Sequence, residues 1–175
     1  MIKKETDTRT ELIELRPIRT EDIVKIKKWP PYLGGFEQMD YALRDNGWID
    51  KFWNRPNTWI YVAEMDRQLI GFSLLSVTVE KDAEFRIAIH PDWTGKGQGR
   101  AVTLAMLKKG FQQLSLGKIH LIVRKNNHRA SKLYSNIGFT KTGESIHTIQ
   151  GKHIEFVDMS LFRERFDNLK IKENA

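Results

Sequence analysis

A strand that leads into a glycine-rich turn and then into a helix constrains this fold more than any other part of the chain. Residues 83–89 (AEFRIAI) alternate in polarity and predict a strand. Its expected faces are Phe85, Ile87 and Ile89 on one side and Glu84, Arg86 and Ala88 on the other. The turn HPDWTGKGQGR (residues 90–100) is followed by a helix expected from Arg100. Its apolar stripe is Leu104, Leu107, Phe111 and Leu114.

Apolar patterns elsewhere predict the remaining elements. Further strands are expected at residues 11–16, 58–65, 69–79, 119–123, 139–149 and 154–162, with turns at 66–68 and Gly151. Further helices are expected at 20–29 with Thr20 as N-cap, at 38–53 with a break at Gly47, and at 127–137 with Gly138 as C-cap. Strands alternate with helices only in the middle of the chain, so we expect an α/β (α+β) fold. Its sheet should be mixed, mostly antiparallel and twisted, with six to seven strands and helices on both faces.

Length and composition favour one domain over residues 1–175, with a core at about 11–163 and a frayed tail beyond about residue 168. The chain has no cysteine, which excludes a disulfide scaffold, a thiolate metal site and a cysteine nucleophile. Its five histidines show no metal-binding spacing. There is no apolar leader at the start, and the longest apolar run, residues 69–79, is too short to span a membrane. We expect a cytoplasmic protein with no metal and no membrane partner.

Charge is distributed unevenly along the chain. The net charge of +7 favours an anionic partner, although a solvated basic surface would give the same total. Residues 31–66 nevertheless carry six acids against three bases, and residues 29–61 hold nine of the 18 aromatic residues. Carboxylates and ring faces both attract cations, so this segment suits an amine, with Glu37 and Asp40 chosen by charge alone. The alternative is that the rings are core residues of two amphipathic helices.

The glycine-rich turn has the properties of a phosphate-binding loop. Gly95, Gly97 and Gly99 have no Cβ, so backbone N–H groups can converge on an anion at the start of the helix. Lys96 and Arg100 add positive charge at the same place. The loop is not a P-loop, because no Gly-Lys-Ser/Thr follows, and its third glycine comes one residue too early for a dinucleotide fingerprint. A flexible loop without a ligand is the alternative.

Together with a second motif, this loop resembles the GCN5-related N-acetyltransferase (GNAT) superfamily. TGKGQG (residues 94–99) is similar to the family pattern [RQ]xxGx[GA], with Thr94 in place of Arg or Gln. Residues 127–139 match NxxAxxLYxxxGF in full. The resemblance covers residues 83–162 in detail and 12–162 in the order of elements. It is strongest to the branch of bacterial spermidine/spermine and ribosomal-protein N-terminal acetyltransferases.

The resemblance implies an enzyme that uses acetyl-CoA as cosubstrate and acetylates a primary amine by direct attack in a ternary complex. The implied cofactor contacts are Ile87, Ala88, Ile89, Thr94, Gly95, Lys96, Gly97, Gln98, Gly99, Arg100, Asn127, Arg129 and Tyr134, with Lys125 as a further basic candidate. Tyr134 is implied as the general acid that protonates the CoA thiolate, and Glu84 as a base or amine anchor. Asn127 could equally cap a helix, Tyr134 could be a core residue, and Glu84 could pair with Arg86.

The acceptor stays open between a polyamine, a peptide or protein N-terminus, and an antibiotic or amino sugar. An alkylamine with a pKa near ~10.4 is almost fully protonated at pH 7, so a base is useful. His90 and His120 are the other titratable groups near the motifs, and either could assist deprotonation, although a lone histidine on a strand is usually structural. Many family members are dimers, so a homodimer is one expectation. The rival functions are a catalytically silent acetyl-CoA sensor and a basic ribosome- or nucleic-acid-binding module, for which no recognition motif is present.

Overall fold

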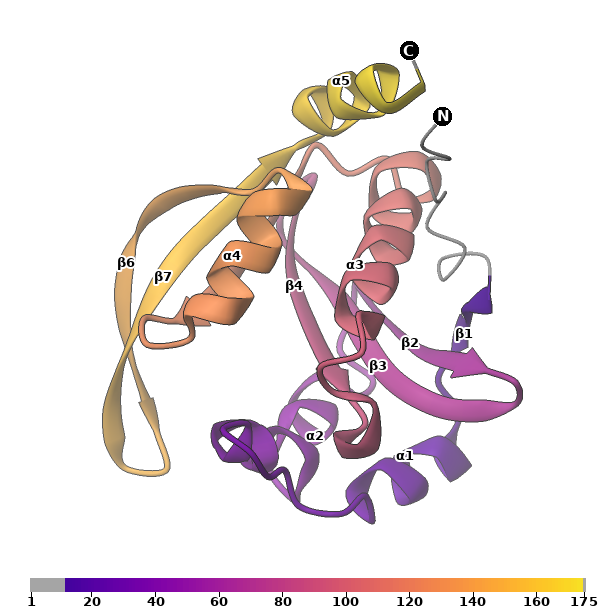
Figure 1. Cartoon of the computed structure of the whole chain (residues 1–175), viewed down its shortest axis with the longest axis vertical. Helices are drawn as coiled ribbons and strands as arrows, with labels where there is room; N and C mark the ends of the chain where they lie inside the picture. The colour runs from indigo at the N-terminus through magenta and orange to yellow at the C-terminus, as the bar shows by residue number, and fades with distance from the viewer. Residues whose placement is uncertain (1–11, 175) are drawn as a thin grey trace, which may run out of the picture. The chain divides into compact units, whose positions relative to one another are not determined.

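The computed structural model describes the backbone of residues 12–174 and the side chains of residues 12–170. These residues form two compact units. Figure 1 labels their helices and strands. Unit 1 comprises residues 12–76 and 86–106, and unit 2 comprises residues 77–85 and 107–174. The division falls within β3 (Gln68–Val79), β4 (Asp82–Ile89) and α3 (Gln98–Lys108).

Unit 1 contains an antiparallel sheet with helices packed against it. Besides β3, the second half of β4 and most of α3, its elements are β1 (Glu14–Pro17), α1 (Thr20–Lys27), η2 (Glu37–Leu43), α2 (Trp48–Phe52), β2 (Thr58–Met65) and η3 (Pro91–Trp93). β1 pairs with β2 and β2 pairs with β3, both antiparallel. Asp66 and Arg67 have φ of +50° and +63° and form the predicted tight turn of the β2–β3 hairpin.

The core of unit 1 is rich in aromatic residues. Trp29, Trp48, Phe52 and Phe72 belong to one buried cluster, in which side chains from α1, η2 and α2 pack on β2, β3 and β4. β3 is buried continuously from residue 70 to residue 76. Because neighbouring residues of a strand point to opposite faces, both faces of β3 are covered. Four of the nine aromatic residues at 29–61 are therefore core residues (Trp29, Tyr32, Trp48 and Phe52), and Phe36 and Tyr41 pack against this core.

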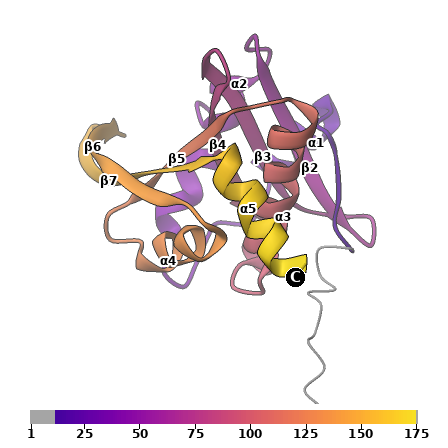
Figure 2. The same ribbon diagram turned by 90° about the horizontal axis from the view of Figure 1, so that it is seen from above.

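Unit 2 contains both parallel and antiparallel strand pairs. Its elements are the last residues of β3 and of α3, the first half of β4, the π-helical segment η4 (Lys109–Gln113), β5 (Lys118–Arg124), α4 (His128–Ile137), β6 (Thr140–Ile149), β7 (Lys152–Phe162) and α5 (Arg163–Asn174). β4 pairs with β5 in parallel, and β7 is antiparallel to both β5 and β6. Figure 2 shows the long β6–β7 hairpin, whose turn is formed by Gln150 and Gly151 at positive φ.

Three local expectations are corrected. The helix predicted from Arg100 begins at Gln98, and Arg19 rather than Thr20 is the N-cap of α1. In β4 the buried residues are Ala83, Phe85 and Ala88, so the regular alternation fails. Within unit 1, a Cβ on Gly71 would lie 3.0 Å from the carbonyl oxygen of Ala88, which shows how closely β3 approaches β4 where Ala88 enters the core.

α5 extends to Asn174 and includes the region beyond about residue 168 in which fraying is expected. Two apolar residues of this charged helix pack against the rest of unit 2. Phe166 is buried against Phe111 with ring centroids 5.0 Å apart, and Leu169 lies over Gly138. Glu11, the first residue of the predicted strand 11–16, lies outside the described residues. No helix within residues 12–174 is long and apolar enough to cross a membrane.

Candidate active site

The glycine-rich turn of unit 1 has the backbone geometry of an anion-binding loop. Gly95 and Gly97 have φ of +76° and +83°, a conformation that side chains rarely adopt. The exposed segment 95–97 leads directly into α3, whose first turn contains no acidic residue. The N–H groups at a helix start have no intrahelical acceptor and attract anions. This chain therefore fits a bound pyrophosphate at the loop.

Two side chains of the loop are engaged within unit 1. The Thr94 hydroxyl donates to the carbonyl of Pro91 at 2.9 Å, so the residue that replaces the usual Arg or Gln fixes the loop itself. The Lys96 ammonium lies 5.3 Å from the centre of the Trp93 ring. Gln98, predicted to contact the cofactor, is instead 5% exposed, and its Oε1 has no hydrogen-bond partner. Arg100 is half-buried at the start of α3.

The end of β4 is tied to the core of unit 1. The Tyr32 hydroxyl donates to the carbonyl of Ile89 at 2.5 Å, and the His90 N–H donates to the carbonyl of Ile70. Ile89, one of the three residues whose backbone is predicted to bind the cofactor, therefore already accepts a hydrogen bond. Ile87 is half-buried and Ala88 is buried.

His90 has a structural role. Its Nδ1 accepts the backbone N–H of Asp92 at 3.0 Å and caps η3, while its ring packs edge-on against Trp29 at 4.8 Å. Burial lowers the pKa of His90, so the ring is neutral at pH 7. This geometry agrees with the structural interpretation of this histidine.

Tyr134 lies in the last turns of α4 in unit 2. Its ring is 8% exposed and packs edge-on against Phe139 at 5.7 Å. Burial raises the pKa of Tyr134, because the phenolate would lose its hydration. The hydroxyl therefore stays protonated at neutral pH, as a general acid must.

The end of α4 holds this tyrosine in place. The N–H groups of Gly138 and Phe139 both donate to the carbonyl of Tyr134, and Gly138 caps the helix at φ +126°. At the start of α4, the Asn127 Oδ1 accepts the N–H of Ala130 at 3.1 Å, which confirms the predicted cap. Lys125 and Arg129 are exposed beside this helix start.

A charged cluster that sequence reasoning missed lies where β4 pairs with β5 in unit 2. Asp82 Oδ1 lies 2.6 Å from His120 Nδ1, and Asp82 Oδ2 lies 2.7 Å from Lys118 Nζ. Glu84 is half-buried in the same strand and is paired in register with His120. Asp82 and His120 are 38 residues apart, so no local spacing signals the contact.

The acidic segment of unit 1 does not present an open negative surface. Four of its six acids have cationic partners: Asp40 pairs with Arg44, Asp45 and Asp50 with Lys27, and Glu64 with Arg16. The hydrogen bond from Lys27 lowers the pKa of Asp50. Glu37, the other predicted substrate contact, is exposed at the start of η2. The charge count over residues 31–66 therefore overstates the attraction for a cation.

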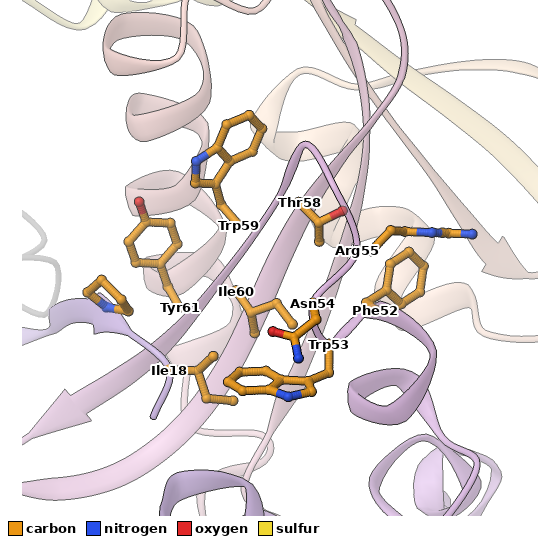
Figure 3. A pocket seen from close by; sticks show the side chains of 10 residues that line it. Ile18, Phe52, Trp53, Asn54, Arg55, Thr58, Trp59, Ile60 and Tyr61 are labelled. Atoms are coloured by element: carbon orange, nitrogen blue, oxygen red, sulfur yellow. The ribbon is translucent and has the colours of Figure 1, made fainter. Parts of the chain in front are cut away.

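A cavity of about 250 Å³ lies elsewhere in unit 1 (Figure 3). Trp59 and Tyr61 of β2 border it on one side and Trp53 and Ile18 on the other, as Figure 3 shows. None of the predicted site residues lines it. Within residues 12–174, no group of three or more His, Asp or Glu side chains is placed to hold a metal ion.

Known proteins resemble this chain along most of its length. Residues 21–139 match the model of the acetyltransferase (GNAT) family. The chain is 31% identical over 171 residues to spermidine N(1)-acetyltransferase of Escherichia coli K12, and the match covers 88% of each chain.

Two solved structures from Vibrio cholerae have the same fold. Mutant forms of its spermidine/spermine N-acetyltransferase give a TM-score of 0.71 at 26% identity, covering 89% of this chain and 98% of that one. Its spermidine N-acetyltransferase in complex with CoA and spermine gives 0.69 at 24% identity, covering 90% and 99%.

These likenesses agree with what the loop and the α4 motif predict. They confirm the α/β class with a mixed, mostly antiparallel sheet and the expectation of an enzyme with acetyl-CoA as cosubstrate. The family match spans well over half of the residues, and the match to the bacterial relative covers 88% of both chains. This chain is an acetyl-CoA-dependent N-acetyltransferase and belongs to the GNAT family.

Proposed function

We propose that this enzyme acetylates a primary amino group of a polyamine of the spermidine class. The observation that carries this proposal is the 31% identity to a spermidine N(1)-acetyltransferase across 88% of both chains. The acidic segment adds little support, because most of its carboxylates are paired within unit 1. The choice of polyamine over peptide or amino sugar therefore depends on the relatives.

The α3 start is the part of the chain that we assign to cofactor binding. Acetyl-CoA, when bound, supplies a thioester that an amine can attack. The backbone of residues 95–99 would receive its pyrophosphate, because glycines at positive φ and the N-terminal end of a helix favour an anion. Lys96 and Arg100 would add positive charge, and Arg129 and Lys125 are candidates for the outlying phosphate of the adenosine.

We assign proton donation to Tyr134. The departing thiolate needs a proton, and a buried phenol that stays neutral at pH 7 can give it. The amine attacks the acetyl group directly in a ternary complex in this proposal. The absence of cysteine supports direct attack, because the chain has no thiol to carry an acyl-enzyme. Glu84 is the proposed anchor or base for the amine.

Release of CoA thiol across a panel of amines tests the acceptor. The panel should contain spermidine, spermine, aminoglycosides, amino sugars and short peptides with Ser or Ala first. We expect spermidine and spermine to give the highest kcat/KM, with intersecting initial-velocity lines for a ternary complex. Higher turnover of a peptide or an amino sugar would overturn the polyamine assignment, and parallel lines would overturn direct attack. Binding of acetyl-CoA without turnover of any amine would favour the sensor.

A further inference from the structure

His120 of β5 is held in one orientation by a carboxylate from the neighbouring strand. Its Nδ1 lies 2.6 Å from Asp82 Oδ1, and Lys118 Nζ fixes the second oxygen of the same carboxylate at 2.7 Å. The Asp82 carboxylate is thus bound at both oxygens. A histidine whose Nδ1 faces a carboxylate carries its proton there and directs Nε2 away as an acceptor. The side chains of Asp82 and His120 are 25% and 29% exposed, so the pair is mostly buried but still accessible to solvent.

The pair lies beside the carboxylate that the sequence nominates as base or amine anchor. In the parallel β4–β5 register, Asp82 is opposite Lys118 and Glu84 is opposite His120. Side chains paired in register project from the same face of a sheet, so Glu84 and His120 share one face of unit 2. On the other side of β5, β7 places the small residue Ser160 opposite His120.

The charged side chains around His120 come from β4, β5 and β7. Asp82 forms an ion pair with Lys118, and Glu84 is the next carboxylate along β4 on the same face. Asp158 of β7 is opposite Ile122, one pair further along, and accepts the Ser145 hydroxyl at 2.6 Å. Two acids from β4 and one lysine from its own strand are therefore the charges nearest His120 in register. A cationic amine is compatible with this set.

We propose that His120 is the proton acceptor for the amine, with Asp82 as its positioning residue and Glu84 as the anchor of the ammonium group. This inference rests on the proposed function. A carboxylate–histidine pair is the arrangement by which many enzymes deprotonate a nucleophile. It also separates the two tasks, base and amine anchor, that the resemblance implies as alternatives for Glu84.

The proton balance of the step is as follows. The ammonium nitrogen loses two protons as it becomes an amide nitrogen. His120 Nε2 takes one and passes it to solvent, and the other replaces the proton that Tyr134 gives to the CoA sulfur. One N–C bond forms, one C–S bond breaks, and no oxidant or further reactant is needed.

The variant His120→Asn tests the proposal, because the Asn amide can still donate to Asp82 but cannot accept a proton from the amine. We expect kcat/KM for spermidine at pH 7 to fall about 100-fold, within the range for loss of a general base. The melting temperature and the affinity for acetyl-CoA should stay unchanged. Asp82→Asn should lower kcat/KM to a lesser extent. His153→Asn, which alters an exposed histidine of β7, is the matched control and should keep full activity.

The pH dependence separates a base from a merely structural residue. As the pH rises from 7 towards 10, more of the amine is already neutral, so the ratio of wild-type to His120→Asn kcat/KM should shrink. A constant ratio, or full activity of the variant, would overturn the role of His120 while leaving acetyl transfer intact. A wild-type enzyme that acetylates no amine would overturn both proposals. A variant that loses activity and melting temperature together would show that His120 is structural.

Discussion

Two helices of unit 1 begin in opposite ways. At the start of α1, the Asp22 carboxylate accepts the Arg19 N–H at 2.8 Å, so the chain neutralises the positive end of this helix with its own anion. At the start of α3 there is no acidic residue, and two glycines at positive φ precede the helix. The first turn of α1 thus carries its own anion, whereas the first turn of α3 carries none. The comparison teaches that the absence of an acid from the first turn, together with the glycines, supports the proposed anion site at α3.

The largest expected effect comes from removing the anion that closes α1. Asp22 is 1% exposed and accepts two hydrogen bonds from Arg16, at 2.7 and 2.9 Å. Asp22→Ala should lower the free energy of unfolding by about 3 kcal/mol, because it leaves the half-buried Arg16 without this partner. Chemical denaturation measures the loss. A change below about 0.5 kcal/mol would contradict the account.

The same carboxylate should make stability pH-dependent. The hydrogen bond from Arg16 holds the pKa of Asp22 below its ordinary value, so the folded state binds fewer protons here than the unfolded state. This contribution is complete above the unfolded pKa of about 3.9 and declines as the pH falls towards the folded-state pKa. Asp22→Asn should therefore be least different from wild type at the acid end. A difference that stays constant down to pH 3 would contradict this linkage.

Placing an anion at the open helix start should prevent cofactor binding. Gly97→Glu puts a side chain at φ +83° and a negative charge where the pyrophosphate is expected. We expect acetyl-CoA affinity to fall at least about 100-fold, about 2.7 kcal/mol, in a calorimetric titration. Gly97→Ala is the matched control for strain without charge and should lose less. Unchanged affinity of the Glu variant would remove the loop assignment.

Changing the proposed acid should affect turnover and not binding. Tyr134→Phe removes one hydroxyl and keeps the ring that packs against Phe139. We expect kcat to fall about 30-fold, with the affinity for acetyl-CoA within about twofold of wild type, because the hydroxyl acts only when the thiolate leaves. Stopped-flow or steady-state thiol release measures the first quantity and calorimetry the second. Equal losses in both would show a packing role.

The smallest expected effect concerns the N-terminus of α4, where the neutral side-chain amide of Asn127 is the N-cap. Asn127→Ala should lower the free energy of unfolding by about 1 kcal/mol, because the Ala130 N–H loses its acceptor. Asn127→Ser restores a cap and serves as the control. If acetyl-CoA affinity also falls in the Ser variant, the residue contacts the cofactor in addition to capping the helix.

Local patterns predicted the parts of the fold that depend on neighbours in sequence. The turns at Asp66 and Gly151 and the break at Gly47 depend on only a few adjacent residues. Regular alternation failed in β4, at the place where Gly71 of β3 closely approaches Ala88. No sequence pattern specifies such a contact in advance.

The same distinction between local and distant contacts holds for the candidate site. The loop and the α4 motif are each contiguous in sequence, so they can be recognised from the sequence alone. Pairs that are distant in sequence, such as Arg16 with Glu64 and Asp82 with His120, cannot be recognised in this way. A charge total over a segment counts such acids as available, and a single strand histidine looks structural until its partner is known.

The contacts of α5 have a consequence for judging shortened or fused versions of this chain. Arg165 donates to the carbonyl of Gly138 at 2.7 Å, and Leu169 covers the same glycine, directly behind the turn that holds Tyr134. A shortened chain that ends at Phe162 would keep every strand and both sequence motifs, so a motif search would still identify it. It would nevertheless lack the contacts of Arg165 and Leu169 with Gly138, next to the helix end that positions Tyr134. An affinity tag on this enzyme is therefore better attached to its N-terminus.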